Sequence, residues 1–477
     1  MQRPLFFIIT VLLLSACGSA KREQQDALLP ILLSDSTQQA TCVFLTTDEN
    51  DQPVVSWCET DKHYRQKKFY MAFFDGRSKS FADRISIPIE QNASLHEEGM
   101  PKIAIKSDGT IIAVYETSVP TDSNSFAGFV RYIVSGDRGK TWTPPTCLHA
   151  DTTSGKSHSF AVITRLSDGE IGACWLDESF DRKIAGRPVK FAKTNPGNRF
   201  TYELTIDSLA CQCCRIAMSH ANGKIFVAFR DIINDSIRDM SVSTSDDNGR
   251  SFKPASSFSN DGWVINGCPH NGPSIAAGKD AVYAAWFTGG RGKGVYYCEL
   301  DKDNLARNKQ LVSEHGGFVQ LCLLPNGNPA LAYSESVQEG DKIYSRIILN
   351  KMEHGKVFEH TIKTDKSMAS YPVIQSFEGN GIVVAWKSAE KVYYTVTNAA
   401  AITTEIQRTS PRELPEAMNF SHIKLTASTD LVCGMPLSLS PGDTTLFQQR
   451  VYGFCSPTCK EKFLLNPDEF LSRSKMK

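Results

Sequence analysis

Cysteine and histidine gather in two short segments of this chain. The first reads Cys211-Gln212-Cys213-Cys214-Arg215, and the second includes Cys268 and His270. Thiolate and imidazole are ligands that copper and zinc bind well in proteins. The sequence therefore predicts a transition-metal site on these two segments, with copper favoured over zinc. A structural disulfide between Cys211 and Cys268, or a reactive thiol, is the alternative interpretation.

A second group of soft ligands lies near the C-terminus. Cys433, Cys455 and Cys459 offer thiolates, and Met435 offers a thioether, which favours copper. Cys455 and Cys459 are spaced so that both sulfurs lie on one face of a helical turn. The segment around them is too short for a robust hydrophobic core, so a metal ion would stabilise it. The alternative is one disulfide and a spare thiol.

The elements that must position the central cysteines form a repeat. Short apolar segments that end in an aromatic residue recur about every 50 residues, a period typical of repeat architectures. Turn sequences such as Ser107-Asp108-Gly109 precede most of them, as in β-hairpins. This pattern predicts an all-β fold, a β-propeller in which the aromatic-ended segments are the innermost strands. The aromatic residues are Trp57, Tyr115, Trp175, Phe229, Trp286, Tyr333 and Trp386.

A propeller would bring several blade-entry loops to one face. Counted back from the aromatic residue of each repeat, His96, His158 and His315 stand near the positions of Cys213 and His270. Such loops surround the central channel, where ligands usually bind. The spacing predicts a Cys/His-lined face, although a histidine taken singly is more often a surface or core residue.

Two further segments carry the pattern S-x-D-x-G-x-[ST]-[WF]. They are residues 135–142 and 245–252, with Asp137 and Asp247 at the acidic position. In such a hairpin the carboxylate accepts backbone hydrogen bonds and the glycine supplies a positive φ, so its role is structural. The pattern resembles the Asp-box of the bacterial neuraminidase repeat, which implies a sialidase-like propeller. Sialidases have six blades and this chain has seven repeats, so six or seven blades are expected.

The sialidase resemblance also implies a set of catalytic residues. That family uses three arginines that bind the sugar carboxylate, a tyrosine nucleophile paired with a glutamate, and an aspartate acid/base. No arginine triad is recognisable in this sequence. His158, Arg230, Arg238 and Tyr371 are the candidates for substrate contacts. For the two arginines, ion pairs that fix loops are the alternative.

The N-terminus resembles a bacterial lipoprotein signal. Arg3 precedes an apolar run that is too short to span a bilayer, and Leu14-Ser15-Ala16-Cys17 resembles a lipobox. This resemblance implies lipidation at Cys17 and an anchor in the bacterial cell envelope, in the outer membrane rather than the inner one. Removing Cys17 from the 14 cysteines leaves an odd number, so at least one thiol lies outside an intramolecular disulfide.

The C-terminal segment resembles a YHS domain, a small α+β metal-binding module. It has a Val432-Cys433-Gly434-Met435 turn, a Phe454-Cys455-Ser456 turn that opens a helix, and a closing apolar segment that includes Phe470. The expected organisation is a signal peptide at 1–17, a tether at 18–39, the propeller at 40–408, a linker at 409–425 and the YHS domain at 426–477.

The charge balance narrows the class of function. The chain has 52 basic and 52 acidic side chains, which gives no broad electrostatic reason to bind nucleic acid. The main hypothesis is an envelope lipoprotein that handles copper or another soft metal. The alternatives are an exo-glycosidase of sialidase type, or a non-catalytic propeller that recognises a glycan or an envelope protein.

Overall fold

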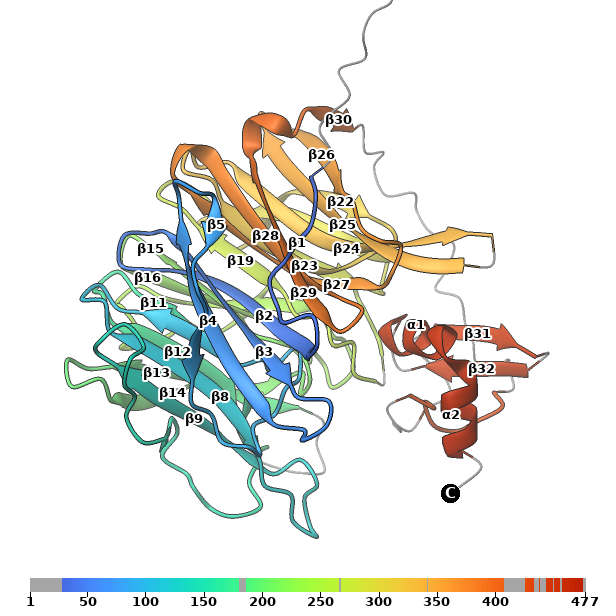
Figure 1. Ribbon diagram of the computed structural model, residues 1–477, viewed down its shortest axis with the longest axis horizontal. Coiled ribbons are helices and arrows are strands. Elements are labelled where there is room, and N and C mark those ends of the chain that lie inside the picture. The colour runs from blue at the N-terminus through green and yellow to red at the C-terminus, as the bar shows by residue number, and fades with distance from the viewer. Residues whose placement is uncertain are drawn as a thin grey trace, which may run out of the picture.

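The computed structural model describes residues 28–179, 186–265, 267–340, 342–406, 425–432, 437, 443–448, 450–454 and 457–474. Cys17, Cys433, Met435 and Cys455 lie outside the described residues, as does most of the expected linker. Within the described residues, seven sheets follow one another along the chain and form the blades of a β-propeller. Figure 1 shows the chain passing from blade to blade, with the C-terminal unit beside them.

The first four blades contain consecutive strands. Blade 1 comprises β2 (Gln39–Thr47), β3 (Pro53–Thr60), β4 (Lys67–Asp75), β5 (Ser80–Phe81) and β6 (Ile85–Ile87). Blade 2 comprises β7 (Lys102–Ile105), β8 (Ile111–Ser118), β9 (Gly128–Ser135) and β10 (Thr146–Cys147). Blade 3 comprises β11 (Ser159–Arg165), β12 (Ile171–Leu176), β13 (Arg187–Thr194) and β14 (Phe200–Ala210). Blade 4 comprises β15 (Ala217–Ala221), β16 (Lys224–Arg230), β17 (Met240–Ser245) and β18 (Ser256–Ser257).

Blade 5 also contains consecutive strands, whereas blades 6 and 7 each include one strand from a distant part of the chain. Blade 5 comprises β19 (Ser274–Ala277), β20 (Val282–Thr288), β21 (Gly294–Leu300) and β22 (Ala306–Ser313). Blade 6 comprises β23 (Gly316–Leu323), β24 (Pro329–Glu339), β25 (Lys342–Glu353), β26 (Lys356–Ile362) and β30 (Thr404–Ile406). Blade 7 comprises β27 (Ala369–Phe377), β28 (Gly381–Ser388), β29 (Lys391–Asn398) and β1 (Ile31–Leu32), with short 3-10 turns at Glu378–Asn380 and Ala399–Ala401.

The N-terminal strand closes the ring. β1 pairs antiparallel with β29, with Ile31 opposite Tyr394, so the last blade takes its outer strand from the start of the chain. Leu33 also donates its backbone N–H to the carbonyl of Val392. The ends of the propeller are therefore held together by backbone hydrogen bonds, as closure of an all-β ring requires.

The aromatic-ended segments are the second strands of the blades. The first strands, β2, β7, β11, β15, β19, β23 and β27, contact one another in a closed ring and are innermost. The prediction that the aromatic-ended strands line the centre was therefore wrong by one strand. Large rings fill the widening space between blades, where Trp57, Trp175, Trp286 and Trp386 are fully buried.

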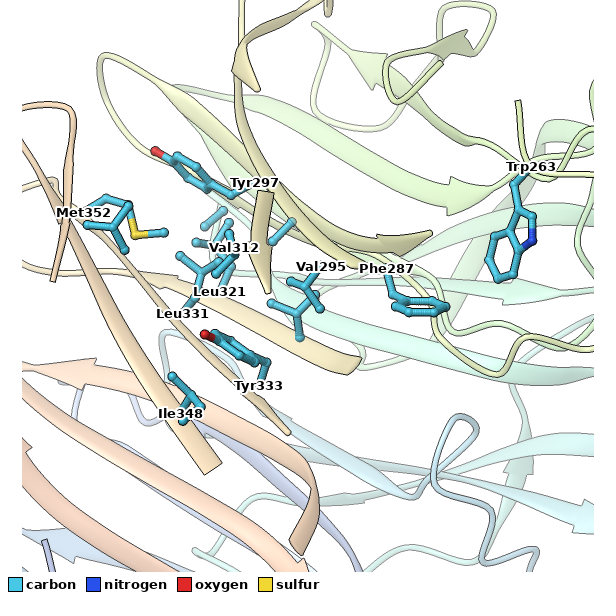
Figure 2. Packing of buried hydrophobic residues seen from close by; sticks show 14 of the residues in the cluster. Trp263, Phe287, Val295, Tyr297, Val312, Leu321, Leu331, Tyr333, Ile348 and Met352 are labelled. Atoms are coloured by element: carbon cyan, nitrogen blue, oxygen red, sulfur yellow. The ribbon is translucent and has the colours of Figure 1, made fainter. Parts of the chain in front are cut away.

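The hydrophobic core lies between neighbouring blades. Figure 2 shows the packing between blades 5 and 6, where Val295 and Tyr297 meet Leu331, Tyr333 and Ile348. Because every blade buries both faces against its neighbours, the strands read as nearly continuous apolar runs. This packing fixes the blade positions and therefore the positions of the loops that carry the site.

The two Asp-boxes occupy equivalent hairpins, between the third and fourth strands of blades 2 and 4. Asp137 accepts hydrogen bonds from the backbone N–H of Thr141 at 2.9 Å and from its hydroxyl at 2.6 Å. Gly139 has a φ of 86°, and a Cβ there would lie 2.6 Å from the Met71 side chain of blade 1. The hairpin therefore needs glycine to pack on the neighbouring blade, in agreement with the structural role expected for Asp137 and Asp247.

The C-terminal unit has its own small core. It contains β31 (Asp443–Phe447), β32 (Arg450–Phe454), α1 (Pro457–Leu465) and α2 (Pro467–Ser474). Phe463 is fully buried among the rings of Phe447, Tyr452 and Phe454. Helix α1 contacts β25 of blade 6, which places the unit against the propeller. Across the described ranges, no helix combines the length and apolar character needed to cross a membrane.

We expect Asp137→Asn to lower the stability of the propeller at neutral pH but not at low pH. Hydrogen bonds from Thr141 lower the pKa of Asp137 to about 2. A carboxyl whose pKa is depressed by folding stabilises the protein above its unfolded pKa of 3.8, and this contribution is lost as the pH falls towards 2. Denaturant unfolding of both proteins at several pH values measures the difference. The exposed Asp303→Asn is the control, and a difference that does not shrink with falling pH would contradict the expectation.

Candidate metal centre

Two blade-to-blade loops carry the central cysteines. Cys211, Cys213 and Cys214 follow β14 and lead into β15, so they join blade 3 to blade 4. Cys268 and His270 lie between β18 and β19, where blade 4 continues into blade 5. Both loops run from an outer strand to the next inner strand. They therefore lie at the same end of the propeller, which brings the two segments together.

The cysteine sulfurs are close together and buried. The Cys211 sulfur lies 3.8 Å from that of Cys213 and 3.9 Å from that of Cys214. The donor atoms of Cys213, Cys268 and His270 form a second group within 4.8 Å of one another. Ligands about 2.3 Å from one ion are about 3.8 Å apart in a tetrahedral arrangement, so the sulfur spacing suits ligation.

The thiols of the cluster form no disulfide. Cys211 and Cys268 are not bonded to each other, so the structure does not contain the disulfide considered as the alternative. Hydrogen bonds from Cys213 and His270 lower the pKa of Cys268 to about 6. Hydrogen bonds from Cys213 and Cys214 hold the pKa of Cys211 well below its usual value, whereas burial raises the pKa of Cys213. Burial also raises the pKa of Cys214, so the thiolate character of the cluster lies on Cys211 and Cys268.

A buried ion pair joins the two cysteine loops to other blades. The Glu98 carboxylate, with a fully buried side chain, accepts a hydrogen bond from the Arg215 guanidinium at 2.7 Å. It also accepts the backbone N–H groups of Arg215 at 3.0 Å and of Gly272 at 3.1 Å. Arg215 donates in turn to the Val319 carbonyl of blade 6. Glu98, from the loop between blades 1 and 2, thus fixes both cysteine loops at once.

Glycine is required where these loops meet. A Cβ on Gly272 would lie 2.2 Å from the carbonyl oxygen of Arg215. No other residue allows the Cys268 loop to approach the Cys211 loop this closely. The next residue back, Asn271, accepts the backbone N–H of Phe318 with its side-chain oxygen at 2.9 Å, which ties the loop to blade 6.

His96 lies beside His270. Its ring lies 5.2 Å from that of His270, centroid to centroid, and 5.8 Å from that of Phe160. The Nδ1 atom of His96 accepts the backbone N–H of Glu98. Burial lowers the pKa of His96, which favours the neutral ring, so its proton lies on Nε2. His96 therefore presents an N–H donor rather than a lone pair to the site.

Tyr371 of blade 7 and helix α1 border the same region. Burial raises the pKa of Tyr371 well above its usual value, and the negative charges of Glu98 and Glu97 add to this effect. The charge of Cys459 in α1 also raises the pKa of Tyr371. The charge of Lys462 in the same helix lowers the pKa of His96. Cys459 is itself buried in the core of the C-terminal unit. One candidate ligand of the C-terminal unit is therefore close to the propeller site.

The region from residue 78 to residue 383 matches the model of the BNR repeat-like domain family. The chain belongs to this family. No curated protein matches it. A GH93 α-L-arabinofuranosidase of Fusarium graminearum aligns over 79% of this chain and 99% of its own, with 10% identity and a TM-score of 0.48. A variant of the NanB sialidase of Streptococcus pneumoniae aligns over 79% and 71%, with 9% identity and a TM-score of 0.46. A protein of unknown function from Dyadobacter fermentans aligns over 62% and 93%, with 16% identity and a TM-score of 0.41.

Arg230 has a structural role in this BNR propeller. Arg230 is 1% exposed and donates to the backbone carbonyls of Arg238, Asn271 and Phe287, each at 2.8 Å. Its guanidinium also lies over the Trp263 ring. Arg238 is buried, and its charge helps to lower the pKa of Cys211, after the hydrogen bonds from the neighbouring thiols. The bonds of Arg230 fix loops, as its alternative interpretation held, but they go to backbone carbonyls rather than to carboxylates.

His158 and His315 lie outside the cysteine cluster. The His158 ring stacks on His149 with centroids 3.6 Å apart, and its Nδ1 lies 2.6 Å from an Asp177 oxygen. His315 accepts the backbone N–H of Ser336 with its carbonyl group. These two histidines stand at a similar position in their repeats to His270. They lie at different places in the structure, because loop lengths differ from blade to blade.

Sequence reasoning missed Glu98 and Asn271, which hold the loops in place. Glu98 stands two residues after His96, and Asn271 directly follows His270. Their proximity to candidate ligands was the available signal. Neither belongs to a ligand pattern, and their partners are distant in the sequence.

A cavity of about 340 Å³ lies away from the candidate metal ligands, and its lining includes Asp35, Trp57, Arg84 and Tyr394. The four cysteines themselves are at most 7% exposed. The cysteine cluster is therefore a packed site rather than an open cleft.

We expect Arg230→Ala to destabilise the BNR propeller by about 3 kcal/mol or more, because buried carbonyls lose their donor. Denaturant unfolding measures this, with the exposed Arg77→Ala as the matched control. A variant that unfolds like the wild type would contradict the structural role and return Arg230 to the substrate-contact candidates.

Proposed function

We propose that this protein is an envelope-anchored lipoprotein whose BNR propeller binds a soft transition metal, copper in preference to zinc. The observation that carries the proposal is the convergence of two overlapping groups of donors. The four cysteines Cys211, Cys213, Cys214 and Cys268 are buried together, and the partly buried His270 lies against them. The five side chains come from two loops of different blades. Together the two loops hold four cysteine sulfurs and one imidazole close to one another, a set of donors that suits a soft metal.

Copper(I) suits this ligand set better than harder ions. It prefers thiolate and imidazole ligands and accepts low coordination numbers, whereas structural zinc takes four tetrahedral ligands. The site is buried against Phe160, which limits access by water. Such a site favours tight retention of the metal over exchange with solvent.

The C-terminal unit is proposed as a second metal-binding element. Its resemblance to a YHS domain implies ligation by Cys433, Cys455 and Cys459, with Met435 as a further ligand. Support comes from the position of Cys459, which is buried and whose charge raises the pKa of Tyr371 in the propeller. The two metal elements of the protein would then face each other.

Anchoring is proposed at Cys17, through a lipid on the bacterial envelope and on the outer membrane rather than the inner one. Support comes from the lipobox-like sequence before Cys17 and from the short distance along the chain between Cys17 and β1. An envelope position would expose the protein to copper before the metal reaches the cytoplasm.

We expect the full chain, purified without chelators, to retain copper, and Cys268→Ser to weaken its binding by at least about tenfold. Anaerobic competition with a copper(I) chelator measures the affinity, and elemental mass spectrometry measures the content. Cys298→Ser is the control, because Cys298 belongs to a separate buried cluster of blade 5. Equal affinity in both variants, or zinc in place of copper, would contradict the proposal.

Glycoside hydrolysis is a second candidate function, favoured by the BNR family and by one geometric feature. Tyr371 lies near Glu97 and Glu98, whose charges raise its pKa, which resembles the tyrosine and glutamate pair of sialidases. Against this candidate, Arg215 is bonded to Glu98 and Arg230 to backbone carbonyls. The terminal nitrogens of both guanidinium groups are thus bonded within the protein.

We expect the wild-type protein to release fluorophore from sialoside or arabinofuranoside substrates no faster than the Tyr371→Phe variant does. This variant keeps the ring and its packing on Phe318, where the centroids are 4.1 Å apart, and removes the nucleophile. Release by the wild type that Tyr371→Phe abolishes would establish the second candidate. A fluorimetric assay with both substrates, at equal protein concentration, decides between the outcomes.

A further inference from the structure

The candidate ligands of the metal centre form two overlapping groups rather than one shell. Among the described residues, Cys211, Cys213 and Cys214 form the first group, and Cys213, Cys268 and His270 form the second. Within each group all donor atoms lie within 4.8 Å of one another. A tetrahedral ion needs four donors around one point. Each group supplies three, and Cys213 belongs to both.

We propose that the site binds two copper(I) ions bridged by the sulfur of Cys213. Cys211 and Cys214 complete the ligands of one ion, and Cys268 and His270 complete those of the other. A thiolate sulfur has enough lone pairs to bind two ions, whereas an imidazole nitrogen has one, so the shared position must be a cysteine. This inference rests on the proposed function, because it concerns the same soft-metal site.

The sulfur spacing suits three-coordinate ions. Ligands about 2.3 Å from an ion are about 4.0 Å apart in a trigonal planar arrangement. The Cys211 sulfur lies 3.8 Å from the Cys213 sulfur and 3.9 Å from the Cys214 sulfur. The first group therefore encloses a copper(I) ion with little movement of the loop.

Two buried arginines lie close to the cysteines, Arg238 near Cys211 and Arg230 near Cys214. Their positive charge favours thiolates in a buried site, where uncompensated charge is costly. Each thiol that binds copper(I) releases its proton to solvent. One zinc ion would find only three donors in either group.

The test counts copper ions in the propeller. The full chain carries Cys433→Ala, Cys455→Ala and Cys459→Ala, so that the C-terminal thiols bind none. Copper(I), kept reduced with ascorbate, is titrated anaerobically against a chelator. We expect two tightly bound equivalents, and a short copper–copper distance in the X-ray absorption spectrum. The spectrum tests the bridge without any substitution in the cluster.

Substitutions then separate the two groups. We expect Cys211→Ser and His270→Ala each to remove one equivalent, and Cys213→Ser to remove both. Cys298→Ala is the control and should retain two. One equivalent in the parent chain, or two without a short copper–copper distance, would overturn the bridged pair and leave the proposed function standing. No tightly bound copper in the parent chain would overturn the proposed function itself.

Discussion

The ion pair between Glu98 and Arg215 is the interaction on which the site depends. One carboxylate from the loop between blades 1 and 2 binds the guanidinium and backbone of Arg215 and the backbone of Gly272. It thereby holds the two cysteine loops against each other. Removing one partner of such a pair leaves an uncompensated buried charge, so both residues are needed to keep the loops in place.

The surroundings of the cysteines are organised by charge as well as by packing. Arg230 and Arg238 would be the obvious candidates for anion binding in a sialidase-like fold. In this protein Arg230 holds backbone carbonyls, including that of Asn271 next to His270, and both arginines lie close to thiols. The family gives the fold, whereas the function depends on the residues of the site.

Much of the fold followed from local patterns. The repeat of aromatic-ended strands predicted the propeller, and the Asp-box sequences predicted hairpins whose hydrogen bonds are entirely local, as with Asp137 and Thr141. The assignment of the innermost strands failed, because burial of Trp57 or Trp386 between blades leaves the same apolar pattern as burial at the centre. Local patterns also could not predict that Ile31–Leu32 closes the last blade, because the partner strand of this segment, β29, lies near the other end of the propeller sequence.

The sequence by itself determined which residues could bind a metal and that a propeller would carry them, because residue type and strand period are local properties. Only the tertiary structure decided which candidates meet. In the folded protein His96 lies next to His270, whereas His158 contacts Asp177, although His96 and His158 stand at similar positions in their repeats. It also supplied Glu98, whose role exists only through contacts with residues more than one hundred positions away. Contacts of that range depend on blade order and loop length, which residue types alone do not encode.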